Sequence, residues 1–204
     1  MSDGTVLTRS FSAPPVSQKE ILRYMGCREA DGDLLDLIRE IGDEAMPRFC
    51  YRVCFREAEL RKNDGNLAFC GLLTESRDLA RNLEGCARVV LFAATVGLEI
   101  DRLIAKYSRL SPSRAVILQA LGAERVESLC DAFLEDLRRE YEPMGVEFRP
   151  RFSPGYGDLP LAFQADLFGV LDCPRRIGLS LNQSFLMSPT KSVTAIVGLR
   201  SPDV

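Results

Sequence analysis

The segment RPRFSPGYGD, residues 149–158, stands out because it combines two arginines, a serine, a tyrosine and an aspartate with a Pro-Gly pair. Pro154 restricts Ser153 to extended backbone, and Gly155 permits a positive φ angle. A bend of this kind lets the main chain approach a ligand closely while Tyr156 lies over it. We therefore expect an exposed loop with varied polar contacts at this point of the fold.

The side chains of this bend match the needs of an amino-acid ligand that carries an adenosyl group. Such a ligand requires a guanidinium for its carboxylate, an acid for its ammonium, backbone groups for adenine, and an aromatic ring or carboxylate near its sulfonium. Arg151, Asp158 and Tyr156 provide three of these groups. The competing interpretation is a proline-containing turn with a solvated charge pair, and the pattern alone leaves both interpretations open.

Around the bend, helices and strands are interspersed without a regular β-α-β order or an internal repeat. Alternating or continuous apolar runs predict strands at 48–56, 87–94, 146–152, 177–181 and 192–199, with 67–71 as the hairpin partner of the first. Apolar stripes at helical spacing predict helices beginning near Ser17, Asp33, Ser76, Leu98 and Ser111, and one that carries Leu161, Ala165, Phe168 and Leu171. These patterns favour one α+β domain over residues 1–204, with a mostly antiparallel, twisted sheet and surrounding helices.

Local signals add detail to these elements. Ser17 and Glu20 match a capping box, in which the hydroxyl and the carboxylate bond the first free amides of a helix. Alternation along 48–56 predicts a half-buried strand, and the turn before 67–71 is expected at residues 63–65. Arg175 and Arg176 are expected in an exposed loop between a helix and a strand.

Composition excludes several classes of function. The chain has 204 residues, a formal net charge of -3 and a pI near 5.2, without a basic run that would hold a polyanion. The N-terminus lacks the pattern of a signal peptide, and apolar residues nowhere run long enough for a membrane span. We therefore expect a cytoplasmic protein whose partners are neither nucleic acid nor membrane.

The chain contains no histidine, which removes the usual general base and the commonest transition-metal ligand. Its seven cysteines include no CxxC pair, so neither a zinc site nor a disulfide framework is indicated. Catalytic triads and histidine-based metal centres are therefore excluded, and we predict no catalytic side chain and no metal site.

The residues of the bend resemble a known family. Arg151 to Tyr156 read Arg-Phe-Ser-Pro-Gly-Tyr, similar to the Arg-Pro-Ala-Pro-Gly-Tyr signature that binds S-adenosylmethionine in the activation domain of vitamin B12-dependent methionine synthase. Further along, the stretches 177–189 (IGLSLNQSFLMSP) and 191–195 (KSVTA) resemble that family's Thr-Gly-Met-Lys-Leu-Thr-Glu-Ser-Phe-Ala-Met-Trp-Pro and Ala-Ser-Val-Ser-Gly. The resemblance is strongest over residues 115–200 and suggests a short, stand-alone form of this domain.

The resemblance implies a ligand site at the bend. Arg151 would bind the methionine carboxylate, the main chain around Ser153, Pro154 and Gly155 would meet adenine, and Tyr156 would lie along the ligand. Asp158 belongs to the same candidate set, and the resemblance of residues 123–128 adds Glu127, with Glu124 as the alternative, for the ammonium. The early aspartate motif of the family has no counterpart, and the sequence ends before the family's terminal tyrosine contacts.

The resemblance also implies a function. In the family, inactive cob(II)alamin is reduced by one electron and methylated from S-adenosylmethionine, so the domain acts by positioning the sulfonium methyl against cobalt. Cobalamin would be supplied by a partner methionine synthase or related corrinoid protein, and the electron by a flavodoxin- or ferredoxin-like donor.

Two other functions are compatible with a chain of this kind. One is a docking or cap module for a corrinoid protein that has lost S-adenosylmethionine binding, and the affinity for that ligand distinguishes it. The other, an ordinary methyltransferase, is disfavoured because no strand leads into a GxGxG turn with an acid downstream.

Overall fold

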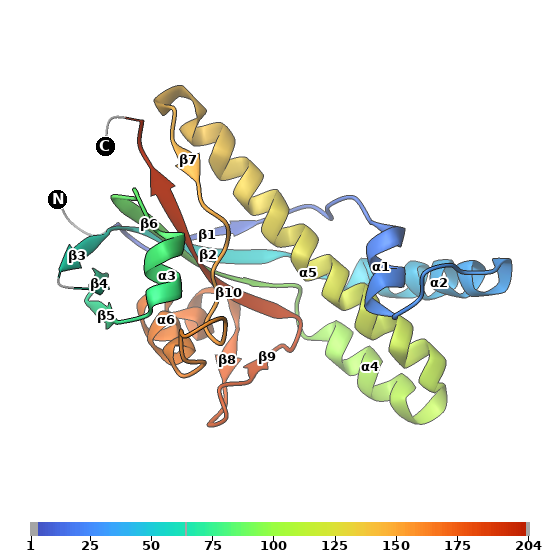
Figure 1. Cartoon of the computed structure of the whole chain (residues 1–204). Coiled ribbons are helices and arrows are strands. Elements are labelled where there is room, and N and C mark those ends of the chain that lie inside the picture. Colours follow the sequence, from blue (N-terminus) through green and yellow to red (C-terminus); the bar gives the residue numbers. More distant parts are fainter. Residues whose placement is uncertain (1–3, 64, 203–204) are drawn as a thin grey trace.

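The computed structural model describes residues 4–63 and 65–202, and its centre is a five-stranded antiparallel sheet (Figure 1). The strands follow the order β1-β2-β6-β10-β7, and each neighbouring pair is antiparallel. Their bounds are Leu7–Ser10 (β1), Arg52–Glu59 (β2), Arg88–Thr95 (β6), Glu147–Phe148 (β7) and Ser192–Arg200 (β10). The predicted α+β class with a mostly antiparallel sheet is therefore confirmed, and the apolar run at 87–94 forms the middle strand.

Helices cover both faces of this sheet. Besides two short 3-10 turns at Met46–Arg48 and Glu142–Met144, the helices are Gln18–Tyr24 (α1), Gly32–Ala45 (α2), Arg77–Asn82 (α3), Glu99–Leu110 (α4), Pro112–Tyr141 (α5), Phe163–Leu171 (α6) and Cys173–Ile177 (α7). One core lies between the sheet and α5, and a second core lies on the opposite face under α3, α6 and α7. Successive residues of β2 enter different cores, since Val53 and Phe55 pack toward α5 while Cys54 packs toward α7.

The strand predicted at 48–56 is therefore buried on both faces in its middle, not half-buried. The prediction failed because the second face carries short residues such as Cys54 and Ala58, which do not mark a strand as fully buried by their size. The helices that cover them, α6 and α7, come more than 100 residues later in the chain.

Two small sheets complete the architecture. The strands Arg61–Asn63 (β3), Asn66–Phe69 (β4) and Leu72–Thr74 (β5) form one of them, and Ser180–Leu181 (β8) pairs with Met187–Ser188 (β9) in the other. The residues expected to return as the partner of 48–56 thus pair with β3 and β5 instead. Of the expected turn at 63–65, residue 64 lies outside the described residues.

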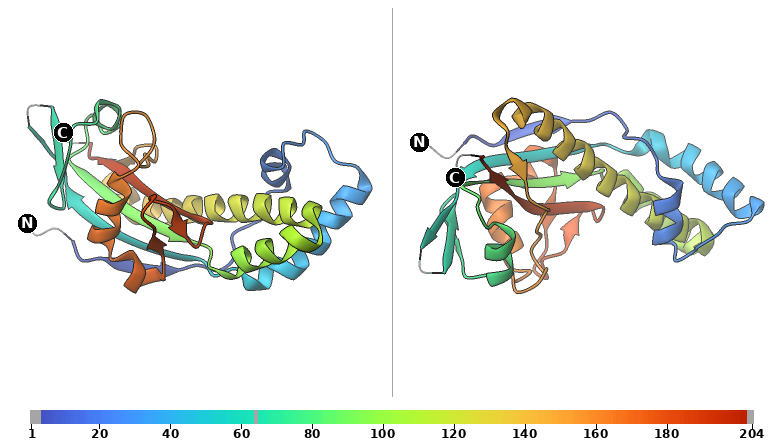
Figure 2. Two further views of the ribbon diagram at one scale, coloured as in Figure 1. Left: turned by 90° about the horizontal axis from the view of Figure 1, so that it is seen from below. Right: turned by 45° about the horizontal axis from the view of Figure 1, so that its top comes forward.

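Helices α1, α2 and α4 pack against the N-terminal half of α5 and form an arm that projects beyond the sheet (Figure 2). Asp31 caps α2 by accepting a hydrogen bond from the Leu34 amide at 2.9 Å. Pro112 occupies the first turn of α5, where its missing amide hydrogen costs no hydrogen bond. In the described residues, no helix is both long and apolar enough to span a bilayer.

The capping box at α1 is formed only in part. The Ser17 hydroxyl accepts from the Glu20 amide at 3.4 Å, as expected. The Ser17 amide donates to Glu124 of α5 at 3.0 Å instead of to Glu20, which pairs with Arg23. A long-range carboxylate therefore replaces the local one and ties the start of α1 to α5.

The segment expected as a strand at 177–181 begins as a helix. Ile177 is the last residue of α7, Gly178 follows with a φ of 70°, and only Ser180–Leu181 is extended. Arg175 and Arg176 accordingly lie on the last turn of a helix rather than in a loop. Basic side chains at this end interact favourably with the helix dipole, which explains their position.

Candidate functional site

The bend is anchored to the central sheet at one residue. Phe152 and Ile196 exchange two backbone hydrogen bonds, of 2.9 and 2.8 Å, which set the segment beside β10. The bend then closes on itself, because the Gly155 amide donates to the Leu159 carbonyl at 2.9 Å and Gly155 has a φ of 87°. Only glycine adopts this conformation without strain, so the positive φ predicted for Gly155 is confirmed.

Arg151 lies against α5 rather than in solvent. Its Nη2 atom donates to Glu127 at 2.9 Å and to Asp131 at 3.1 Å, and its side chain is only 25% exposed. The structure thus brings together Arg151 and Glu127, two residues that the sequence assigned to one site. Asp131 was missed, although its place four residues after Glu127 puts both carboxylates on one face of the helix.

The cluster of Arg151, Glu127 and Asp131 offers groups of both signs to a ligand. One guanidinium faces two carboxylates, so the cluster carries a formal charge of minus one. Both ion pairs of Arg151 are made through Nη2, which leaves Nε and Nη1 without a carboxylate among the described residues. Cys130 lies beside the cluster, and burial raises its thiol pKa to about 12, so the thiol stays neutral.

Tyr156 is the most exposed large side chain of the bend, at 73% of its surface. Its ring packs edge-on against Phe152, with 6.0 Å between the ring centroids. Pro154 between them is buried and Ser153 is half-buried, and the Ser153 carbonyl accepts from the Tyr156 amide at 3.1 Å. The Tyr156 ring is therefore positioned by Phe152 while most of its surface stays accessible.

Asp158 has a different environment from the other predicted site residues. Its carboxylate accepts from the Ser76 hydroxyl, from the Arg77 amide at 2.8 Å and from the Asp78 amide at 3.2 Å. These bonds, foremost that from Ser76, lower the pKa of Asp158 below its ordinary value. The carboxylate caps α3 and thereby holds the end of the bend to that helix.

Glu124, the alternative to Glu127, is not accessible to a ligand. Its side chain is 1% exposed and forms an ion pair with the fully buried Arg125. Glu124 also accepts from the Ser17 amide and the Ser128 hydroxyl, and Arg125 donates to the carbonyls of Pro14 and Pro15. This network holds the segment before α1 against α5, which is a structural role.

Beside the bend, part of one edge of β10 has no strand partner. Ser192 to Leu199 pair with β6, but in the described structure the opposite edge is paired only at Ile196, Gly198, Leu199 and Arg200. Backbone groups alternate in direction along a strand, so the amide and carbonyl of Thr194 point the same way as those of Ile196. They place one donor and one acceptor next to the bend.

The acidic side chains and the cysteines of the described residues are dispersed. No group of three or more Cys, Asp or Glu side chains there could hold a metal ion. Of the seven cysteines, Cys54, Cys86, Cys130 and Cys173 are buried, and Cys50 alone is exposed.

Comparisons with known proteins give one family and one similar fold. The model described as "Vitamin B12 dependent methionine synthase, activation domain" matches residues 77–201. Among solved structures, the "MetH Reactivation Domain bound to AdoHcy" is similar with a TM-score of 0.73 at 17% identity, over 98% of this chain and 79% of that one. At this identity the likeness concerns the fold. No curated protein matches the chain.

Proposed function

Because the chain belongs to the family of vitamin B12-dependent methionine synthase activation domains, we propose that it binds S-adenosylmethionine and presents it to a cobalamin held by a partner. The observation that carries the proposal is the cluster of Arg151, Glu127 and Asp131 beside the bend. The similar reactivation domain was crystallised with AdoHcy, which is S-adenosylmethionine after loss of the methyl group.

The charges of the cluster suit the amino-acid end of this ligand. Nε and Nη1 of Arg151, which face no carboxylate in the described structure, would receive the ligand carboxylate, while Glu127 and Asp131 would receive the ammonium. The ligand carries a net charge of plus one, from two cationic groups and one carboxylate, and the cluster carries minus one. The ligand therefore neutralises the cluster, which favours binding over that of a plain anion.

The nucleoside end would lie along the main chain of the bend. The bend leaves β10 at the bridge between Phe152 and Ile196, and the Thr194 amide and carbonyl on the same edge would offer one donor and one acceptor to a purine. Tyr156 would cover the ligand from the solvent side. Asp158 contributes indirectly, because it fixes the end of the bend to α3.

The reaction that we propose is the reductive methylation of cob(II)alamin, in which the sulfonium of the ligand supplies the methyl group. The side chains of this chain bind and orient the ligand, and none has to transfer a proton. The corrinoid is assigned to a partner methionine synthase or related corrinoid protein, because this chain has no histidine for cobalt. The electron is assigned to a flavodoxin- or ferredoxin-like donor, and the reaction to the cytoplasm, where free cysteines stay reduced.

Calorimetry with S-adenosylmethionine tests the proposal. We expect saturable binding to the wild type and a loss of at least about tenfold in affinity for Arg151→Met, since a charge-assisted bond to the carboxylate is removed. Arg114→Met is the matched control, because the Arg114 side chain is similarly exposed, at 24%, and forms an ion pair with Glu40 of α2. It should leave the affinity unchanged.

A specific observation favours one alternative function. Arg151 is already engaged by two carboxylates of its own chain, as in a module that keeps the fold but has lost the nucleoside. If saturating S-adenosylmethionine gives neither heat nor a thermal shift with the wild type, the chain is a docking module for a corrinoid protein.

A further inference from the structure

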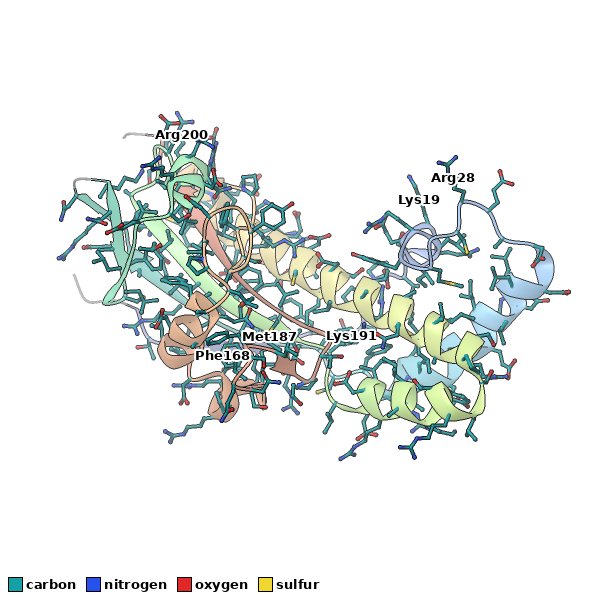
Figure 3. All side chains as sticks on the ribbon, turned by 60° about the horizontal axis from the view of Figure 1, so that its bottom comes forward. Lys19, Arg28, Phe168, Met187, Lys191 and Arg200 are labelled. Carbon is teal, nitrogen blue, oxygen red and sulfur yellow. The ribbon has the colours of Figure 1, made fainter. Side chains whose placement is uncertain are left out.

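The projecting arm contains a cavity that the proposed function does not use. Both α1, on which Figure 3 labels Lys19, and α2 pack against the N-terminal half of α5, and a cavity of about 230 Å³ lies between the three helices. Its apolar lining comes from these helices and from residues next to them: Val16, Ile21, Leu35, Ile38, Met46 and Leu121. Ile21, Ile38 and Leu121 are buried, whereas Val16 is 49% exposed, so the cavity reaches from the core of the arm to its surface.

A glycine keeps the cavity open on the side of α2. Leu35, Ile38, Gly42 and Met46 follow one another at intervals of three or four residues and therefore share one face of the helix and its end. Glycine weakens the interior of a helix, and packing does not require it here, because a β-carbon at residue 42 would have no atom within 4 Å. A larger side chain at this position would fill the cavity.

The wall that Val16 contributes is fixed by the buried ion pair of α5. Arg125 donates to the carbonyls of both residues before Val16, at 2.6 and 2.7 Å. The amide of the residue after Val16 donates to Glu124 at 3.0 Å. The irregular segment is thus held on both sides of Val16, and the cavity is formed before any ligand binds.

Two opposite charges stand at the exposed rim of the cavity. Arg39 and Asp43 both line it and lie one turn apart on α2. Arg39 is 71% exposed and pairs with Asp36 through Nη1 at 2.6 Å, which leaves other N–H groups of its guanidinium free to donate. Asp43 is exposed and, in the described part of the chain, has neither a hydrogen bond nor an ion pair.

An apolar cavity under neighbouring charges of opposite sign matches one class of small molecule. An aliphatic acid would pair with Arg39 but be repelled by Asp43, and an aliphatic amine would meet the reverse. A free α-amino acid carries both charges next to each other, with its side chain beyond them. A dry cavity of about 150 Å³ already binds benzene, whereas drug-sized ligands occupy about 300–1,000 Å³, so the cavity suits an amino acid better than a nucleoside.

We infer that this cavity binds a free α-amino acid with a long apolar side chain, whose carboxylate meets Arg39 and whose ammonium meets Asp43. None of the residues that line the cavity belongs to the bend or to the cluster of Arg151, Glu127 and Asp131. The inference therefore does not depend on binding of S-adenosylmethionine at the bend.

Titration of isotope-labelled protein with methionine, followed by NMR, tests the inference. We expect saturable shifts of backbone amides in α1 and α2, that of Gly42 among them. Alanine has the same two charges but a short side chain, so it should bind at least about tenfold more weakly. Shifts confined to the bend, or equal affinities for methionine and alanine, would overturn the inference.

A variant that fills the cavity tests its place in the fold. Gly42→Leu should abolish the binding of methionine while the midpoint of urea unfolding stays unchanged or rises, because the new side chain enters open space. Gly169→Leu in α6 is the matched control, since a β-carbon there also has no atom within 4 Å, and it should keep the affinity of the wild type. Wild-type affinity in Gly42→Leu would show that methionine binds elsewhere.

A second variant tests the charge at the rim. Asp43→Asn should weaken binding of methionine about tenfold, because the partner of the ammonium is neutralised. It should change the affinity for an analogue of methionine without the amino group less than twofold. Equal losses for the two ligands, or no loss for methionine, would contradict the role of Asp43.

Discussion

Arg125 shows how a single charged residue can organise this chain from within. Its side chain is fully buried against Glu124, and its guanidinium also bonds the carbonyls of Pro14 and Pro15. The sequence gives no sign of this, because Glu and Arg in the middle of a helix usually lie on a solvated face. A buried charge of this kind requires its partner, since desolvation is offset only by the pairing.

Arg125→Met should therefore destabilise the protein by about 3–5 kcal/mol, as expected when a buried ion is left without its partner. Urea unfolding measures the difference. Arg23→Met is the control, because Arg23 forms an ion pair with Glu20 while 59% exposed, and its loss should cost less than about 1 kcal/mol. Equal effects of the two substitutions would contradict the assigned role of the buried pair.

For the predicted site residues too, the sequence reveals some of the contacts in the structure and not others. The pairing of Arg151 with Glu127 follows from residues that the sequence marked, because both belong to stretches that resemble the family. The capping role of Asp158 does not, since its partners Ser76, Arg77 and Asp78 are about 80 residues away in the chain. Local patterns identify groups able to bind a ligand, but not which of them the fold uses internally.

Among the secondary-structure elements, those with long apolar patterns were predicted best. The strands β6 and β10 and the helix α5 lie close to their expected positions, because burial of a whole face dominates their sequence. Short elements failed where tertiary contacts decide. Ile177 was assigned to a strand but ends α7, where it enters the core beneath the sheet with Cys173.

Close packing on β10 of the segment that follows α3 can be tested at Gly198. A β-carbon there would lie 2.6 Å from Sγ of Cys86 and 2.7 Å from Cδ2 of Leu83. Gly198→Ala should therefore destabilise the protein by about 1–3 kcal/mol through overpacking. Gly169→Ala in α6, where no atom lies within 4 Å, should instead leave stability unchanged or raise it by up to about 1 kcal/mol.

Thermal or urea unfolding of both glycine variants measures the change in stability. We expect a loss for Gly198→Ala and none for Gly169→Ala, because only at Gly198 would the added β-carbon meet other side chains. If Gly198→Ala is as stable as Gly169→Ala, Leu83 and Cys86 do not pack on β10 as described.

In the whole molecule, the proposed ligand site lies where the central sheet meets α5, the helix that continues into the projecting arm. The sheet supplies β10, the arm continues into α5, and the bend joins them beside the cluster of Arg151, Glu127 and Asp131 (Figures 1 and 2). Composition alone excluded histidine chemistry, and the resemblance of the bend indicated the family, which the match over residues 77–201 confirms. Neither indicated that Arg151 would face two carboxylates.

A crystal structure of the protein with AdoHcy tests the proposed binding site most directly. We expect density between the bend and α5, with the ligand carboxylate at Arg151 and the purine along residues 153–155 beside Thr194. Clear density for Arg151 still closed on Glu127 and Asp131, with no ligand beside it at saturating AdoHcy, would contradict the proposed function.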